Sequence, residues 1–169
     1  MHFRFAIAAV LYYYLTSCYV RCFPSGAPHE SCETLSPERG HKAPSQPVQY
    51  APFSVVATAR NFEPGERIGV EIFQRDSREN FKGFMVQALD AYLHQPIGQF
   101  VPTHGMKLLR ECAAVSHSDS RPKKAVNLVW QAPPDHSGEV IFRATIVQSK
   151  ELYYANILAH NAQEYYFST

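Results

Sequence analysis

Two alternating apolar stretches, separated by a proline-rich break, constrain the fold more than any other feature of the chain. They cover residues 125–131 and 138–147. Side chains alternate between the two faces of a strand, so each stretch has one wholly apolar face. These faces carry Val126, Leu128 and Trp130 in the first stretch, and Val140, Phe142, Ala144 and Ile146 in the second. With Pro133-Pro134-Asp135 and Gly138 between them, the pattern predicts a hairpin of antiparallel strands packed on a core.

Other short stretches extend this β-rich interpretation. Residues 53–59, 67–74 and 98–101 are predicted strands, and 107–112 and 113–117 are predicted to flank a bend. Residues 81–91 fit a helix or a strand, and Gly83 and the short length favour the strand. Twelve prolines and eight glycines in 169 residues favour turns over long helices. We therefore predict an all-β, antiparallel β-sandwich of six to eight strands.

The N-terminal 22 residues have the layout of a secretory signal peptide. A short basic start precedes the uncharged apolar run 5–15 and a small-residue exit. The alternative is a buried N-terminal strand or helix, because the run is too short to span a bilayer comfortably. Cleavage after Cys18 or after Cys22 fits the sequence equally well. No later stretch approaches a transmembrane span, so we expect a secreted, soluble protein without a membrane span.

The cysteine count after cleavage is informative. Removal of residues 1–22 leaves Cys32 and Cys112, for which one disulfide is the simplest state in an oxidising compartment. Two unrelated buried thiols are the alternative, and cleavage after Cys18 would leave Cys22 as a third cysteine. The proline-rich, aperiodic segment 23–52 is then predicted to be an extended leader attached through Cys32. Trp130, on the apolar face of its strand, is expected in the core, near the disulfide.

The residue types that carry enzyme chemistry are scattered. Seven histidines remain after cleavage, without metal-binding spacing or a neighbouring cysteine pair, so we expect no metal site. The sequence has no Gly-x-Ser-x-Gly nucleophile motif and no glycine-rich phosphate loop after a strand. With Arg4 and Arg21 removed, 14 basic residues face 15 acidic ones, which gives no indication of nucleic-acid binding. We expect neither an enzyme nor a cofactor.

A basic cluster is the remaining candidate binding site. Five cations fall within eighteen residues: Lys107, Arg110, Arg121, Lys123 and Lys124. Lysine and arginine bind phosphate readily, so the cluster predicts contact with phosphates on a bacterial surface. The alternative is a solvated loop that aids solubility.

Several segments together resemble the reeler, or reelin-type, domain. They are Gly26-Ala27-Pro28 with Cys32, Lys82 to Ala88, Pro96 to Phe100, Cys112, Ser116-His117-Ser118, Trp130 to Pro133, and Gly138 to Val147. They follow the order of that family and cover about residues 23–157. One departure is Tyr153-Tyr154, where the family often has Tyr-Trp. We assign 1–22 to the signal, 23–157 to the reeler domain, and 158–169 to a tail that forms a strand or helical turn or frays.

This resemblance implies an immunoglobulin-like sandwich and a Cys32–Cys112 disulfide. A signal peptide followed by a solitary reeler domain is similar to the small secreted defence proteins of arthropods, of the noduler type. The expected function is non-enzymatic recognition of bacterial surface glycolipids or cell-wall polymers, such as lipopolysaccharide or lipoteichoic acid, with promotion of haemocyte aggregation. The rival functions are a structural or adhesive extracellular protein and, by analogy with reductase fusions, a redox accessory.

Overall fold

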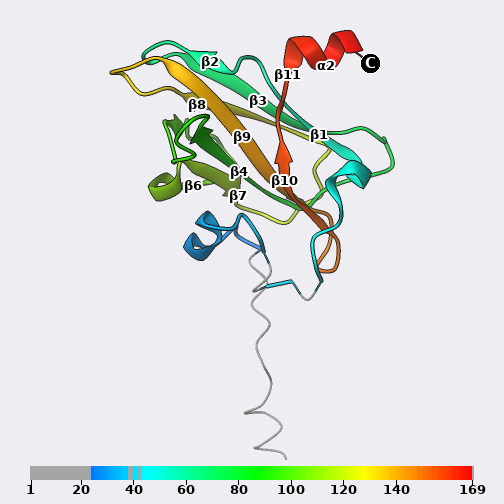
Figure 1. Ribbon diagram of the computed structural model, residues 1–169. Coiled ribbons are helices and arrows are strands. Elements are labelled where there is room, and N and C mark those ends of the chain that lie inside the picture. The colour runs from blue at the N-terminus through cyan, green and yellow to red at the C-terminus, as the bar shows by residue number, and fades with distance from the viewer. Residues whose placement is uncertain (1–23, 38–39, 42, 169) are drawn as a thin grey trace, which may run out of the picture.

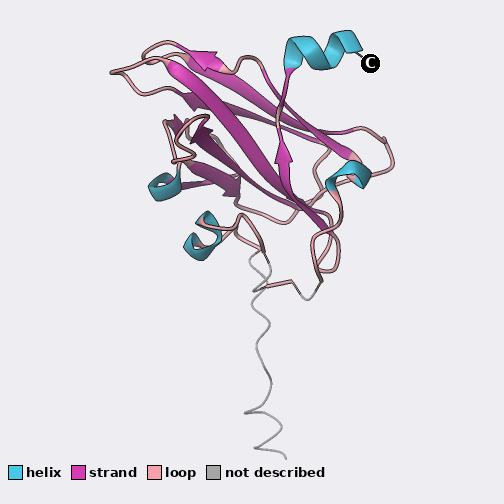
Figure 2. Ribbon diagram, in the orientation of Figure 1, coloured by secondary structure: helices cyan, strands magenta, loops and turns pink. Residues whose placement is uncertain are grey.

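Two β-sheets packed face to face make up the protein, as the computed structural model shows (Figures 1 and 2). The structure describes residues 24–37, 40–41 and 43–168, so the predicted signal peptide lies outside the described residues. Every strand pair is antiparallel except β1–β11, which is parallel. The all-β sandwich predicted from the alternating pattern is confirmed.

The strand orders of the two sheets are as follows. The five-stranded sheet runs β11 (His160–Asn161), β1 (Phe53–Ala57), β3 (Arg67–Gln74), β8 (Ala125–Gln131), β5 (Gln99–Phe100). The six-stranded sheet runs β10 (Tyr153–Leu158), β9 (Gly138–Val147), β4 (Gly83–Asp90), β7 (Ala114–His117), β6 (Met106–Leu109), with β2 (Asn61–Phe62) also paired to β9. Short helical turns are η1 (His29–Cys32), η2 (Val48–Tyr50) and η3 (Arg110–Cys112), and one α-helix, α2 (Ala162–Ser168), ends the described chain. No helix in the described ranges has the length and apolar character needed to cross a bilayer.

The core lies between the sheets and is built from the predicted apolar faces. Ile68, Val70 and Ile72 of β3 are at most 1% exposed. They face the apolar sides of β9 and β4, whose members include Phe142, Ala144, Ile146, Phe84 and Val86. The rings of Trp130 and Phe142, one from each sheet, meet edge to face with centroids 5.6 Å apart. For β3, β8 and β9, alternation alone therefore identified which side of the strand faces the core.

The predicted hairpin at 125–147 is wrong, although its faces are right. β8 pairs with β3 and β5, whereas β9 pairs with β4, β10 and β2, so the connection 132–137 carries the chain from one sheet to the other. A period of two residues determines where side chains point but not which strand supplies the hydrogen bonds. The proline-rich break is the crossover of a sandwich rather than a tight turn.

The C-terminal residues add structure to the five-stranded sheet. His160 and Asn161 pair in parallel with Val56 and Ala57. The following helix α2 places the Tyr165 hydroxyl 2.9 Å from the Ser54 hydroxyl, and its ring meets that of Phe73 edge to face. The tail thus provides both a short strand and a helix over the outer face of β1.

Candidate functional site

The leader, described at residues 24–37 and 40–41, lies along the outer face of the six-stranded sheet. Cys32, at the end of η1, is bonded to Cys112 at the end of η3, with Cα atoms 5.8 Å apart and a sequence separation of 80. Leu35 follows and is 1% exposed, in a small cluster with Met85, Leu109 and Cys112. This second cluster is separate from the main core that holds Trp130. The expectation that Trp130 lies near the disulfide is therefore wrong.

Backbone contacts at Gly26-Ala27 hold the start of the described leader. The Ala27 N–H donates to the Ser116 hydroxyl at 3.0 Å, and the Ala27 carbonyl accepts from the Lys107 ammonium at 2.9 Å. Gly26 has φ +103°, and a Cβ there would collide with the His117 carbonyl oxygen. Glycine is required because both the left-handed conformation and this close approach exclude a side chain. The Gly-Ala-Pro segment is thus a docking element for the leader.

A buried polar network joins the leader to β4 and β9. The Gln87 amide donates to the carbonyls of Cys112 at 3.0 Å and Cys32 at 3.4 Å. Its side-chain oxygen accepts two bonds from the Arg143 guanidinium, at 2.9 and 2.7 Å. Arg143 also donates to the Glu33 carbonyl at 3.5 Å. Gln87 is 2% exposed, so these bonds satisfy polar groups that water does not reach.

The far end of the leader is attached to the β9–β10 turn. The His41 ring nitrogen Nδ1 lies 2.9 Å from the Lys150 carbonyl oxygen, and its ring packs against that of Tyr153. Burial lowers the pKa of His41 from its ordinary value, which favours the neutral ring. The Thr145 hydroxyl donates to the Leu35 carbonyl at 2.6 Å and fixes the middle of the leader. The leader is therefore bonded to the sheet along its length.

A cleft of about 910 Å³ remains between this leader and the sheet. One wall consists of leader residues, and the other comes from β4, the end of β9, the turn 148–152 and the start of the 118–124 loop. Lining residues include Leu35, Lys82, Phe84, Ser120, Val147 and Lys150. The volume lies within the range of small-molecule binding sites, which are mostly apolar with a few polar groups. The cleft is our candidate functional site.

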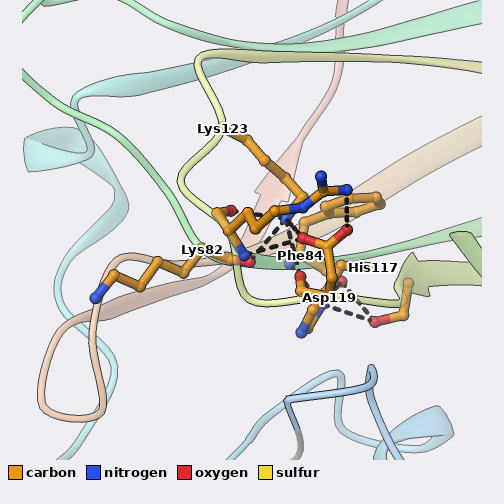
Figure 3. Close-up of polar contacts among 7 residues, drawn as sticks. Lys82, Phe84, His117, Asp119 and Lys123 are labelled. Atoms are coloured by element: carbon orange, nitrogen blue, oxygen red, sulfur yellow. Dashed lines mark hydrogen bonds and ion pairs between the residues drawn. The ribbon is translucent and has the colours of Figure 1, made fainter. Parts of the chain in front are cut away.

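The loop 118–124 borders this cleft at Ser120, and we call this loop the lip. It carries three of the predicted ligand-binding cations, Arg121, Lys123 and Lys124. Figure 3 shows Lys123 beside Asp119 and Lys82. The Lys123 ammonium donates to four oxygens: the Lys82, Asp119 and Arg121 carbonyls and the Asp119 carboxylate. The Arg121 guanidinium donates to the Asp119 carboxylate at 2.8 Å. The side-chain and backbone bonds from Arg121, followed by Lys123, hold the pKa of Asp119 well below its ordinary value. Asp119 therefore remains charged and organises the loop.

The five predicted cations do not form one patch. Arg121 and Lys123 share Asp119, and Lys124 is exposed beside them. Lys107 bonds the leader, and Arg110 donates to the Gln99 side chain at 2.9 Å. Lys123, with a side chain only 15% exposed, is a structural lysine in this arrangement. Of the three cations on the lip, Arg121 and Lys124 are exposed to solvent and can therefore contact a ligand there.

His117 is the histidine that contacts the cleft from the sheet side. Its Nδ1 lies 3.1 Å from both the N–H and the carbonyl oxygen of Phe84, and Ser116 donates to that same carbonyl at 2.7 Å. The ring covers Gly83, where a Cβ would come within 2.8 Å of it. The Ser116-His117 pair thus links β7 to β4 and to the leader.

Metal-ligand geometry among the described residues occurs in one group, Cys32, Glu111 and Cys112. Its two sulfur atoms are bonded to each other, so they are not available as thiolate ligands. Sequence reasoning did not assign Lys82, Gln87 or Lys150 to a site, although Lys82 and Gln87 lie in a segment that resembles the reeler family. The signal that places them at the site is long-range pairing, because β4 and β9 bring residues 82–87 next to 143–150.

Comparison with known proteins identifies the fold and its relatives. The family model described as "Reeler domain" matches residues 30–164. The chain belongs to the reeler domain family. A relative named "Putative defense protein 3", from Antheraea mylitta, is 31% identical over 93% of both chains. The reeler segment of "Ferric-chelate reductase 1" from Bos taurus is 31% identical over 82% of this chain, which spans only 24% of that larger protein.

Solved structures agree with this reeler assignment. The reelin-N domain of F-spondin is 26% identical, with a TM-score of 0.53 over 64% of this chain and 83% of its own. The human F-spondin reeler domain, at 24% identity, has a TM-score of 0.54 over 64% of this chain and 86% of its own. The two-sheet architecture is therefore that of reeler domains. The defence-protein relatives indicate a defence role, and the family indicates a non-catalytic domain.

Proposed function

We propose that this reeler protein is exported, non-enzymatic and recognises anionic bacterial surface molecules of the lipopolysaccharide or lipoteichoic acid class. The observation that carries the proposal is similarity over 93% of both chains to a relative named as a defence protein. A second such relative, from Bombyx mori, is 26% identical over 89% of this chain and 90% of its own. Binding to bacteria would in turn promote haemocyte aggregation.

The lip of the cleft is the proposed contact for phosphate groups. Arg121 projects from the 118–124 loop with 78% of its side chain exposed, and Lys124 is exposed next to it. One Asp119 carboxylate oxygen accepts from the Arg121 guanidinium and the other accepts from the Lys123 ammonium. Because Arg121 is already held in this way, little conformational freedom is lost when an anion docks. Exposed cations bind phosphate mainly through charge, so added salt should weaken this contact.

The test uses the double variant Arg121→Ala/Lys124→Ala and binding to purified lipopolysaccharide. We expect about tenfold weaker binding and a shallower salt dependence, because two charge-assisted contacts are removed. The matched control is Arg67→Ala/Arg78→Ala, which removes the same charge, and its Arg78 makes an equivalent pair with Asp76. An equal loss in both double variants would contradict a specific contact at the lip.

Secretion and the defence role have their own readouts. Mass spectrometry of protein collected outside the cell should show a chain that begins after Cys18 or after Cys22. Transcript induction after bacterial challenge is expected of a defence protein and not of a constitutive matrix component. Haemocyte aggregation should increase when the purified protein is added together with bacteria, and unchanged aggregation would contradict that part of the proposal.

A further inference from the structure

The floor of the cleft is apolar and suited to a hydrocarbon chain. Val147, on the outer face of β9, is the partly exposed apolar side chain on the sheet side of the cleft. Leu35 and Phe84 also line the cleft but are at most 2% exposed, and Phe84 packs in the main core. Three leader prolines add apolar surface: Pro24, Pro28 and Pro37. A chain of methylene groups enclosed here would be stabilised by roughly 0.8 kcal/mol for each group fully removed from water.

One end of the cleft carries two lysines without partners. The Lys82 N–H donates to the Val147 carbonyl at 2.8 Å, which places Lys82 beside the turn 148–152 that carries Lys150. Neither ammonium group bonds to any residue that the structure describes, and the Lys82 side chain extends away from the Asp119–Lys123 contacts (Figure 3). Glu151, on the same turn, accepts from the Ser149 hydroxyl at 3.3 Å. This end therefore keeps a net positive charge.

The other carboxylates of the cleft lie at its opposite end. Glu30 and Glu33 belong to the leader beside the disulfide, where Gln87 bonds the Cys32 carbonyl. Gln87 lies four residues along β4 from Gly83, which is about 13 Å at the rise of a strand. The negative groups are thus separated from Lys82 by roughly the length of the floor. An anionic group is favoured only at the Lys82–Lys150 end.

We propose that this cleft binds an anionic single-chain amphiphile, with its acyl chain against Val147 and the three leader prolines and its phosphate between Lys82 and Lys150. The inference deepens the proposed function, on which it rests, because glycolipids of bacterial envelopes combine acyl chains with phosphate. In this arrangement the lipid portion of a glycolipid binds in the cleft. The lip residues Arg121 and Lys124 contact phosphate groups farther from the acyl chain.

The test is calorimetric titration of the purified, oxidised protein with lauroyl lysophosphatidate below its micelle concentration. Two further probes test the parts of this ligand one at a time: glycerol 3-phosphate has the charged head group without the acyl chain, and monolauroylglycerol has the acyl chain without the charge. Val147→Trp, which fills the floor, should weaken both chain-bearing probes at least tenfold. Lys82→Ala/Lys150→Ala should weaken lysophosphatidate about tenfold and leave monolauroylglycerol unchanged, because only the charged contact is lost.

Matched variants make the outcome decisive. Val129→Trp adds the same bulk on the outer face of the five-stranded sheet, where Val129 is 37% exposed, and should bind both probes like the wild type. The melting temperature of Val147→Trp confirms that it is folded, and the lysine double variant tests the site without altering its shape. Wild-type affinity in Val147→Trp, or equal affinity for glycerol 3-phosphate and lysophosphatidate, would overturn the inference.

The two proposals fail separately. Binding of whole lipopolysaccharide without binding of lysophosphatidate would overturn the cleft site and leave the recognition role intact. Binding of lysophosphatidate without binding of bacteria or lipopolysaccharide would overturn the recognition role and leave the cleft site intact.

Discussion

The outer faces of the two sheets differ in how they are covered. On the six-stranded sheet the outward side chains Met85, Gln87 and Thr145 are at most 3% exposed, because the leader covers them. On the five-stranded sheet α2 covers one end, and the outward side chains of β8, Ala125, Asn127 and Val129, remain exposed. The sheets share one architecture, so the covering segment, rather than the sandwich, creates the candidate site.

The comparison also shows what a segment without secondary structure needs in order to stay in place. The leader forms only short turns and brings one well-buried apolar side chain, Leu35. It is held instead by a covalent bond, by side-chain bonds to its backbone, and by Gly26 at a close approach. Helix α2, in contrast, lies on β1 through few contacts, among them those of Tyr165.

The largest expected effect comes from removal of the covalent anchor. Cys32→Ser/Cys112→Ser should lower the free energy of unfolding by about 4–5 kcal/mol, because an 80-residue loop is no longer closed in the unfolded chain. Urea denaturation measures the change. A reductant should destabilise the wild type to a similar extent and leave the variant unchanged. A loss below about 1 kcal/mol would show that the other contacts hold the leader by themselves.

The apolar anchor of the leader should have the next largest effect. Leu35→Ala is expected to cost about 2–4 kcal/mol, because the side chain is 1% exposed and its removal leaves a cavity. Val129→Ala, on the uncovered face, should change stability by no more than about 0.5 kcal/mol. Thermal unfolding of the two variants provides the measurement. Equal changes in stability for the two variants would contradict the distinction between the covered and the uncovered face.

Gln87 of the six-stranded sheet and Gln74 of the five-stranded sheet allow the two sheets to be compared by one kind of substitution. Gln87→Ala leaves the Arg143 guanidinium and two leader carbonyls without their partner, so we expect a loss of about 1–3 kcal/mol and faster amide exchange in residues 24–37. Gln74 of β3 is the control, because its side-chain oxygen is buried without a partner. Gln74→Ala should therefore be close to neutral. A larger loss for Gln74→Ala than for Gln87→Ala would contradict the role of the network.

The smallest effect concerns pH at the lip. The pKa of Asp119 lies below its ordinary value of 3.8, so its stabilising contribution is present above that value and is lost as the pH falls through the lower, folded pKa. Carboxyl-carbon NMR should show Asp119 still charged where ordinary aspartates are protonated. Arg121→Ala should raise the pKa of Asp119 and leave that of Asp76, which Arg78 lowers, unchanged. A constant Asp119 pKa in that variant would contradict the assignment.

Much of the sandwich could be predicted because its strands alternate cleanly. The predicted strand 67–74 is β3 with the same bounds, and Ile68, Val70 and Ile72 are its buried residues. Alternation does not reveal strand partners, and for this reason β8 and β9 were expected to pair although each belongs to a different sheet. Pairing depends on contacts between residues far apart in sequence, which no local pattern encodes.

The site was harder to predict than the fold. Cys32 and Cys112 were found, because two cysteines that remain after removal of a predicted signal peptide are most simply paired. The leader has no period, so nothing in the sequence showed which face it covers. Gln87 reads as a solvent-facing position of β4 and becomes buried only when the leader covers it. The same covering gives Lys82 and Lys150 their place at the cleft.

The strand orders of the two sheets have a consequence for how the molecule folds. The central pairs are β4–β9, with Gly83 opposite Val147, and β3–β8, with Arg67 opposite Gln131. Both bring together segments that are far apart in the sequence, so the entropy of large loops must be overcome before either sheet gains its hydrogen bonds. Such topologies fold in milliseconds to seconds rather than microseconds. During that search the apolar strands are available to other chains, so we expect the yield of refolding to fall as the protein concentration rises.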